Sequence, residues 1–250
     1  MCRVESAEEL PNAFDGGRRG AVAAFSDGSL YVEKLVEGAR HVEGQSLADG
    51  LGGVLVAGDR ECSIQRRHQK IIEESPSVVL TPALRASMGG AAVALAQAAG
   101  YTNAGTVEFL LDRSGRFFFL EMNTRLQVEH PVTELVTGID IVKEQLLVAA
   151  GNKLSFTQEQ IIPRGHAIEC RINAEDPFKN FMPSPGTLNR FELPHHPWVR
   201  VDTACYPGYT ILPFYDSLLA KLVVWGRTRE EAIARTKVAL KHFIIEGVST

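Results

Sequence analysis

Two apolar runs joined by a short polar turn constrain the fold of this chain most strongly. Residues 105–111 and 117–122 have the composition of β-strands, and Asp112–Gly115 between them is typical of a turn. Because so short a connection can join only antiparallel neighbours, this part of the chain predicts a hairpin within an antiparallel sheet.

Further segments predict a mixture of strands and helices. We expect a meander of strands over 30–36, 41–47 and 53–57, and later strands over 165–172, 187–191, 199–202 and 218–225. We expect helices over 83–99 and 140–150, a first helix opened by a capping-box pattern at Ser6–Glu9, and a last helix opened by another at Thr228–Glu231. The predicted class is α+β with mainly antiparallel sheets, not a parallel βαβ repeat.

The pattern of predicted elements changes near residues 151–164, which predicts a boundary between two domains. Beyond Pro163, short strand candidates alternate with Pro- and Gly-containing turns, whereas longer elements precede it. A chain of 250 residues can bury one large core or two modest ones. We therefore expect domains over 1–163 and 164–250.

Composition and charge exclude several classes of protein. With 45% hydrophobic residues and a net charge of −4, the chain is neither disordered nor a nucleic-acid protein held by bulk charge. It contains no apolar stretch of the roughly 18 residues that a membrane span needs, and no export signal. Its four cysteines form no C-x-x-C pair, so a reduced, cytoplasmic chain is expected rather than a disulfide framework.

The segment Glu121–Pro131 carries the densest row of polar side chains. If this segment is extended, alternation puts its charged and amide groups on one side, namely Glu121, Asn123, Arg125, Gln127 and Glu129. Such a row predicts a binding surface; the alternative is an edge strand with a polar outer face.

Glu108 is an acidic residue within an apolar run, where an unpaired carboxylate would be unfavourable by several kcal/mol. In the predicted hairpin it can lie close to Glu121, and two adjacent carboxylates repel unless a cation lies between them. Two carboxylates with the amide of Asn123 suit Mg²⁺ or Mn²⁺ bridging phosphates, not zinc. Pairing of Glu108 with Arg116 or another base is the structural alternative.

Two further features contain basic residues. The stretch Cys62–Lys70 is dense in positive charge and suits a phosphate or small anion, although basic loops are often only solvated. Arg171 lies within a predicted strand, where it is either a salt-bridge partner or a site residue.

Taken together, three segments resemble the signatures of one family, the biotin carboxylases of the ATP-grasp class. They are Glu121–Glu134, Arg60–Lys70 and His166–Asp176, and the resemblance extends over essentially the whole chain in the family's order. It implies a partial ATP-grasp domain over 1–163, followed by part of a biotin carboxylase C-terminal domain over 164–250.

The resemblance implies a ligase that uses ATP and bicarbonate, with Mg²⁺ or Mn²⁺. Bicarbonate would attack the γ-phosphate to give carboxyphosphate, and the released CO₂ would be captured by biotin. Because no biotin attachment segment is present, biotin would be carried on a partner, a biotin carboxyl carrier protein or domain. A carboxyltransferase subunit, a homo-oligomer of the full-length form and an acetyl- or acyl-CoA carboxylase of fatty acid biosynthesis are also implied.

The same resemblance assigns a role to each matching position. The metal ligands would be Glu108, Glu121 and Asn123; the bicarbonate site would be Lys70, Arg125, Gln127 and the backbone of Val128. Glu129 would be the general base, and Arg125 and Arg171 would stabilise the biotin enolate, with Arg171 binding biotin. ATP would be bound by Glu33, Lys34 and Val36 at adenine, by His41, Gln65 and His68 near ribose and phosphates, and by Glu108 and Glu121 through the metal.

The chain also departs from the family pattern at both ends. In the family, an N-terminal domain and a Gly-rich phosphate lid precede this sequence, and the C-terminal domain continues beyond it. We therefore expect the chain alone to bind ATP weakly and turn over slowly. The alternative function is a non-catalytic fragment or assembly subunit of a biotin-dependent carboxylase; a carbamoyl-phosphate synthase large chain fits the motifs less well.

Overall fold

The computed structural model describes residues 2–250 and divides into two compact units. One unit ends at Ala39 and the other comprises Arg40–Thr250. Each unit is described by itself.

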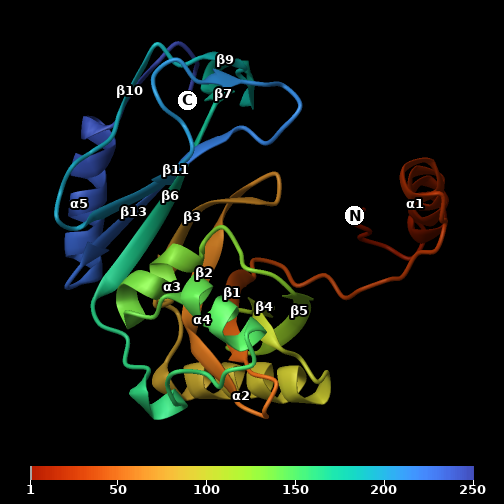
Figure 1. Ribbon diagram of the computed structural model, residues 1–250. Coiled ribbons are helices and arrows are strands. Elements are labelled where there is room, and N and C mark those ends of the chain that lie inside the picture. The colour runs from red at the N-terminus through yellow and green to blue at the C-terminus, as the bar shows by residue number, and fades with distance from the viewer. Residues whose placement is uncertain (1) are drawn as a thin grey trace. The chain divides into compact units, whose positions relative to one another are not determined.

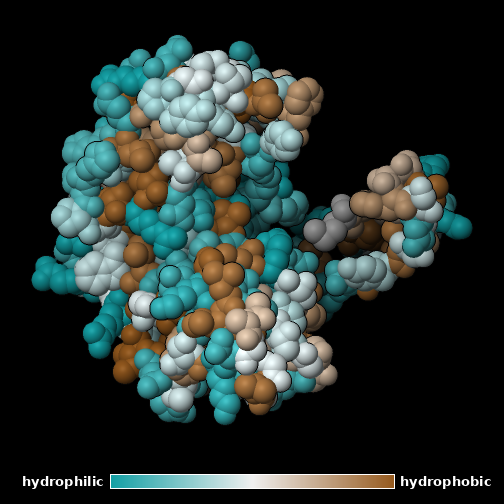
Figure 2. Space-filling model, viewed as in Figure 1, coloured by the Kyte–Doolittle hydropathy of each residue, from teal (hydrophilic) through white to brown (hydrophobic). Residues whose placement is uncertain are grey.

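The first unit contains the helix α1 (Leu10–Phe25). The predicted cap at Ser6 is wrong: the residue before the helix is Glu9, which makes no side-chain cap because its carboxylate accepts the backbone N–H of Glu5 at 3.1 Å. No residue of α1 is buried, and hydrophobic side chains are visible on its surface (Figure 2). The predicted strand over 30–36 is also wrong, because this segment has an irregular backbone and Tyr31 is 83% exposed.

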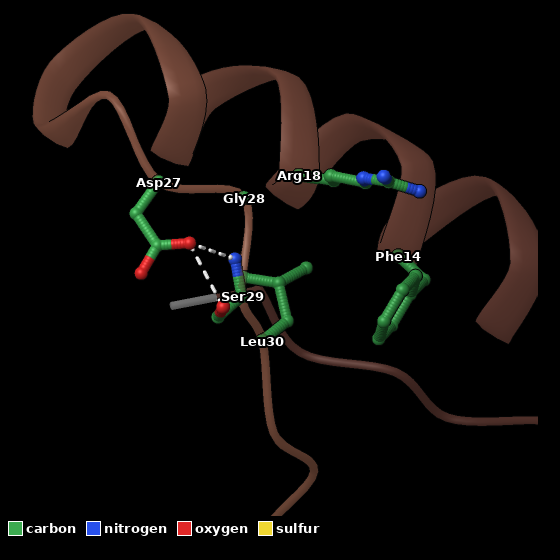
Figure 3. A pocket seen from close by; sticks show the side chains of 6 residues that line it. All are labelled: Phe14, Arg18, Asp27, Gly28, Ser29 and Leu30. Atoms are coloured by element: carbon green, nitrogen blue, oxygen red, sulfur yellow. Dashed lines mark hydrogen bonds between the residues drawn. The ribbon is translucent and has the colours of Figure 1, made fainter.

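A small pocket lies within this first unit, between α1 and the segment that follows it (Figure 3). The carboxylate of Asp27 accepts the backbone N–H and the hydroxyl of Ser29 at 2.9 and 2.8 Å, which closes a turn at one side of the pocket. Its lining residues are Phe14, Arg18, Asp27, Gly28, Ser29 and Leu30, none of which the sequence predicted as a site residue.

The second unit is built on one antiparallel sheet (Figure 1). Within residues 40–250, eight strands lie in the order β11-β13-β6-β3-β2-β1-β4-β5. Their bounds are β1 Arg40–Ala48, β2 Val54–Arg66, β3 Gln69–Ser75, β4 Asn103–Leu111, β5 Phe117–Asn123, β6 His166–Asn173, β11 Val199–Thr203 and β13 Leu218–Gly226. The α+β class with antiparallel sheets is confirmed. β3 pairs with β6, so strands from both sides of residues 151–164 belong to one sheet. The domain boundary placed there stays a prediction.

The observed meander is β1-β2-β3, displaced from the predicted one. The basic stretch expected to be a loop is instead the end of β2, a turn and the start of β3. Arg67 and His68 form the turn with φ of 51° and 64°. Left-handed conformations at both central residues match the twist of a two-residue hairpin, so the chain can reverse tightly there.

Four α-helices cover this sheet within residues 40–250: α2 (Pro82–Ala98), α3 (His130–Thr137), α4 (Ile141–Ala149) and α5 (Arg229–His242). α2 packs Met88 and Ala92 against Val42 and Val107, in one half of the sheet. α5 packs against β6 and β13 in the other half (Figure 1).

The predicted cap of the last helix is confirmed: the hydroxyl of Thr228 accepts the backbone N–H of Glu231 at 3.2 Å. The predicted helices over 83–99 and 140–150 correspond to α2 and α4, whereas α3 was not predicted.

Shorter elements complete the C-terminal part. They are η1 Gln158–Gln160, β7 Glu175–Asp176, η2 Pro177–Lys179, β8 Met182–Pro183, β9 Gly186–Thr187, β10 Arg190–Glu192, β12 Thr210–Ile211 and β14 Ile244–Glu246. Leu188, Phe191 and Ile211 of this part form a small core with Leu219 of β13. Among the described residues, no helix is both long and apolar enough to cross a membrane.

Candidate active site

A row of charged residues runs across four neighbouring strands and defines the site. In the sheet register Glu43 of β1 lies opposite both Arg60 of β2 and Glu108 of β4, and Glu108 lies opposite Glu121 of β5. Residues directly opposite one another share a face of the sheet. Because Val42 and Val107 point to the α2 core, this row lies on the other face.

Glu108 and Glu121 are adjacent, as the predicted hairpin requires. The amide nitrogen of Asn123 lies between them, 3.0 Å from Glu108 Oε1 and 3.1 Å from Glu121 Oε1. Of the alternative partners for Glu108, Arg116 is wrong, since it pairs with Asp112 at 2.8 Å at the turn of the hairpin; another base, Lys70, does pair with Glu108, at 3.0 Å. Two carboxylates and an amide are therefore gathered at one point.

The prediction that residues 121–129 form one extended row is wrong. The strand ends at Asn123, an irregular segment follows, and α3 begins at His130. This segment turns Gln127 and Glu129 inward, where both are buried, whereas Arg125 is exposed with its Nη2 at 3.3 Å from Asn123 Oδ1. The polar groups thus converge through a turn of the chain rather than through strand alternation.

Lys70 is the cation at the centre of the carboxylates. Its Nζ lies 2.5 Å from Glu43, 3.0 Å from Glu108 and 2.5 Å from Glu129. Burial alone would lower the pKa of Lys70, but Glu43 and the other acids raise it well above its ordinary value. Lys70 therefore remains charged and links the sheet to the segment before α3.

Arg171 and Lys70 hold opposite oxygens of Glu129. Arg171 Nη2 lies 3.0 Å from Glu129 Oε2, and its Nε donates to Glu73 Oε1 at 2.6 Å. Burial would lower the pKa of Arg171, but Glu73 and Glu129 raise it. Arg171 is therefore a salt-bridge partner, one of its two sequence-based interpretations, and its role as a site residue stays a prediction.

Glu108 is held as an anion although it is buried. Burial would raise its pKa, but a hydrogen bond from His41 and the charge of Lys70 lower it to about 2. His41 Nε2 lies 2.7 Å from Glu108 Oε2, and Gln127 Nε2 donates to Oε1 at 2.7 Å.

The segment Gln127–Glu129 is fixed by residues that the sequence analysis did not select. Arg60 donates to Gln127 Oε1 at 3.0 Å, and Lys221 donates to the carbonyl of Val128 at 3.1 Å. Arg60 is fully buried and also contacts Glu43 at 2.5 Å. Burial would raise the pKa of Glu43, but Arg60 and Lys70 lower it. Charged residues inside strand-like runs were the available signal for Arg60 and Glu43.

The predicted nucleotide residues are only partly brought together. Gln65 Nε2 lies 3.0 Å from His41 Nδ1, and His41 in turn contacts Glu108. His68 lies exposed in the turn between β2 and β3. Glu33, Lys34 and Val36 belong to the first unit, which is described separately from the site.

Two family models match the chain. Residues 1–157 match "Carbamoyl-phosphate synthase L chain, ATP binding domain", and residues 169–250 match "Biotin carboxylase C-terminal domain". Biotin carboxylase 1 of Bacillus subtilis is 55% identical over 248 residues, which cover 99% of this chain and 55% of that protein. The chain thus spans about half the length of the curated relatives that it matches.

Solved structures agree with these matches. A biotin carboxylase–β,γ-ATP complex from Campylobacter jejuni has a TM-score of 0.95 and 46% identity, and the alignment covers 98% of this chain and 55% of that one. The bicarbonate-bound biotin carboxylase domain of a thermophilic 2-oxoglutarate carboxylase has a TM-score of 0.90 and 49% identity, with coverages of 99% and 56%. The chain belongs to the biotin carboxylase family of ATP-grasp proteins.

Proposed function

We propose that this chain carries out the ATP- and bicarbonate-dependent carboxylation of biotin. The observation that carries the proposal is the arrangement at Glu129: Lys70 and Arg171 bind its two oxygens, 2.5 and 3.0 Å away. Beside it lie the paired carboxylates Glu108 and Glu121. An acid between two cations, next to a metal-type donor set, fits proton removal from a small anion beside a phosphate.

The donors Glu108, Glu121 and Asn123 fit a divalent ion. The Asn123 amide bridges the two carboxylates, and rotating it by half a turn would present its oxygen instead of its nitrogen. The resulting set is all oxygen, as Mg²⁺ and Mn²⁺ prefer. When bound, the metal would neutralise phosphate charge and orient ATP.

Glu129 is proposed as the general base. Its carboxylate would accept the proton of bicarbonate, which leaves a more nucleophilic anion. Bicarbonate itself would be bound by Lys70, Arg125, Gln127 and the backbone N–H of Val128, whose carbonyl Lys221 already holds. The exposed Arg125 and the half-buried Arg171 would stabilise negative charge that develops on biotin.

The nucleotide contacts are proposed from the family pattern. Glu33, Lys34 and Val36 would contact adenine, and His41, Gln65 and His68 would lie near the ribose and phosphates. The His41–Gln65–Glu108 contacts support the phosphate end of this assignment.

The partners and the final acceptor are also proposals. Biotin would come attached to a carrier protein or domain, and a carboxyltransferase subunit would use the product, with the full-length protein acting as a homo-oligomer. We propose an acyl-CoA as the final acceptor. A relative named for 2-oxoglutarate carboxylase makes a keto acid the competing class.

The test is ADP formation that requires both bicarbonate and free biotin. Glu129→Gln should lower this rate at least about a hundredfold, as expected for loss of a general base. Glu192→Gln, which changes an exposed carboxylate paired with Arg190, should leave it unchanged. A wild-type chain that binds a biotin carrier but shows no bicarbonate-dependent ATPase would contradict the proposal and support an assembly subunit.

A further inference from the structure

Two fully buried acids lie opposite each other behind Arg171. Glu73 of β3 and Glu169 of β6 are register partners, and each is 0% exposed. They share the face of the sheet that carries Arg171, two residues beyond Glu169 in the same strand. Ile72 and Ile168 point to the α5 core instead, which fixes the orientation of both acids.

The hydrogen bonds of these two acids are incomplete. Glu73 Oε1 accepts from Arg171 at 2.6 Å, but Glu73 Oε2 and both oxygens of Glu169 accept no hydrogen bond within the described residues. An ionised carboxylate without partners is strongly unfavourable in a protein interior. Two such anions side by side would also repel each other.

The charged groups around Glu169 do not compensate for an ionised carboxylate there. Lys221 of β13 pairs with Asp202 of β11, at 3.2 Å, and donates a hydrogen bond to the carbonyl of Val128. Arg171 forms ion pairs with Glu73 and Glu129. Further titratable or charged groups near the pair are Glu43 of β1, Glu129 and His130 at the start of α3, and Arg200 of β11, which pairs with Glu134 and Asp202.

We propose that Glu169 carries a proton and donates it in a hydrogen bond to the free oxygen of Glu73, and that this acid pair positions Arg171 against Glu129. One proton then gives Glu73 a partner on each oxygen, Arg171 on one side and the Glu169 hydroxyl on the other. Glu73 keeps a single negative charge for Arg171, whose Nη2 stays directed at Glu129. The protonation stands on geometry alone, whereas the positioning role rests on the proposed function.

The directions of the pKa shifts of Glu169 and Glu73 agree with this proposal. Burial, and then the charge of Glu73, raise the pKa of Glu169 well above its ordinary value of 4.5. Burial raises the pKa of Glu73 to about 7, although Arg171 opposes this. The two acids therefore titrate as a pair.

Infrared spectroscopy of the chain at neutral pH tests the protonation directly. A protonated carboxyl group has a C=O stretching band distinct from that of a carboxylate. We expect this band in the wild type, its loss in Glu169→Gln, and its retention in Glu144→Gln. Glu144 is a matched buried acid on α4, whose carboxylate accepts the backbone N–H of Ser155. Absence of the band in the wild type, or its persistence in Glu169→Gln, would overturn the proposal.

The pH dependence of stability gives a second readout. Because the raised pKa values let the folded chain bind more protons than the unfolded chain, stability should fall as pH rises from 4.5 through 7. Glu169→Gln keeps a hydrogen-bond donor but cannot ionise. Its free energy of unfolding relative to the wild type should therefore increase across this range, and a constant or decreasing difference would contradict the proposal.

The positioning role is tested by rescue. In the assay with free biotin, Glu169→Ala should lower the rate about tenfold, the change expected when one hydrogen bond that orients a charged group is lost. Glu169→Gln should recover most of it, and equal losses in the two variants would refute the role. An inactive wild type that still shows the infrared band would refute the proposed function and leave the protonation standing.

Discussion

Replacing Arg60 with methionine tests how much the buried charge row depends on one guanidinium. Arg60 is fully buried and donates to five acceptors on two strands, one loop and α3. Methionine preserves much of the length and the apolar contacts but removes every donor. Glu43 would then retain Lys70, at 2.5 Å, as its nearest cationic partner.

The expected loss follows from these contacts. Removing one partner of a buried ion pair destabilises a protein by about 3–5 kcal/mol, since the other charge stays buried. Lys70 still compensates part of the Glu43 charge, whereas the amides of Gln45 and Gln127 lose a donor. These effects oppose each other, so we expect Arg60→Met to lower the free energy of unfolding by about 3–5 kcal/mol.

The assay is urea unfolding of four proteins: wild type, Arg60→Met, Glu43→Gln and the double variant. The double variant has no buried carboxylate at position 43 that lacks Arg60. Its loss of unfolding free energy should therefore be smaller than the sum of the two single losses by about 1–3 kcal/mol. Arg190→Met, which removes an exposed arginine bound to Glu192 and Glu246, is the control and should have a far smaller effect. Strict additivity, or a loss below about 1 kcal/mol in Arg60→Met, would refute the reasoning.

Three further predictions concern the rest of the sheet. Contacts with His166 and Arg229 outweigh burial and lower the pKa of Glu74 from 4.5 to about 2. Glu74→Gln should therefore lower the free energy of unfolding by its full amount above pH 4.5 and by nothing near pH 2. A loss that does not depend on pH in chemical denaturation would contradict this. Leu222→Ala should lower the free energy of unfolding by about 2–5 kcal/mol, measured by urea, because a fully buried side chain is truncated to a cavity. Gly226→Ala should lower the melting temperature, since its new Cβ would meet the backbone of α5; an unchanged melting temperature would mean that the helix can shift freely.

The sequence predicted the elements whose patterns are local. The hairpin around Asp112–Gly115 and the cap at Thr228 were found because turn residues and capping residues act within a few positions. The strand expected over 30–36 failed for the converse reason. Its β-branched and aromatic residues have strand propensity, but a strand also needs a neighbour to pair with, which local sequence does not reveal.

The sequence predicted that several of these polar residues lie close together, but not how the backbone brings them together. Glu108 stood out as a carboxylate inside an apolar run, and its proximity to Glu121 followed from the hairpin. The inward turn after Asn123 was missed, because an alternating polar pattern can also arise in an irregular segment before a helix. The partners of Arg60 and Glu169 could not be assigned from sequence, since they lie far apart in the chain.

The central claim is that bicarbonate attacks ATP beside Glu129 and Lys70. Transfer of oxygen from ¹⁸O-labelled bicarbonate tests it most directly, because that attack joins a bicarbonate oxygen to the γ-phosphorus. We predict inorganic phosphate that carries one bicarbonate-derived oxygen in the wild type, and loss of this labelled phosphate in Glu129→Gln. Phosphate whose new oxygen comes only from water would contradict the account.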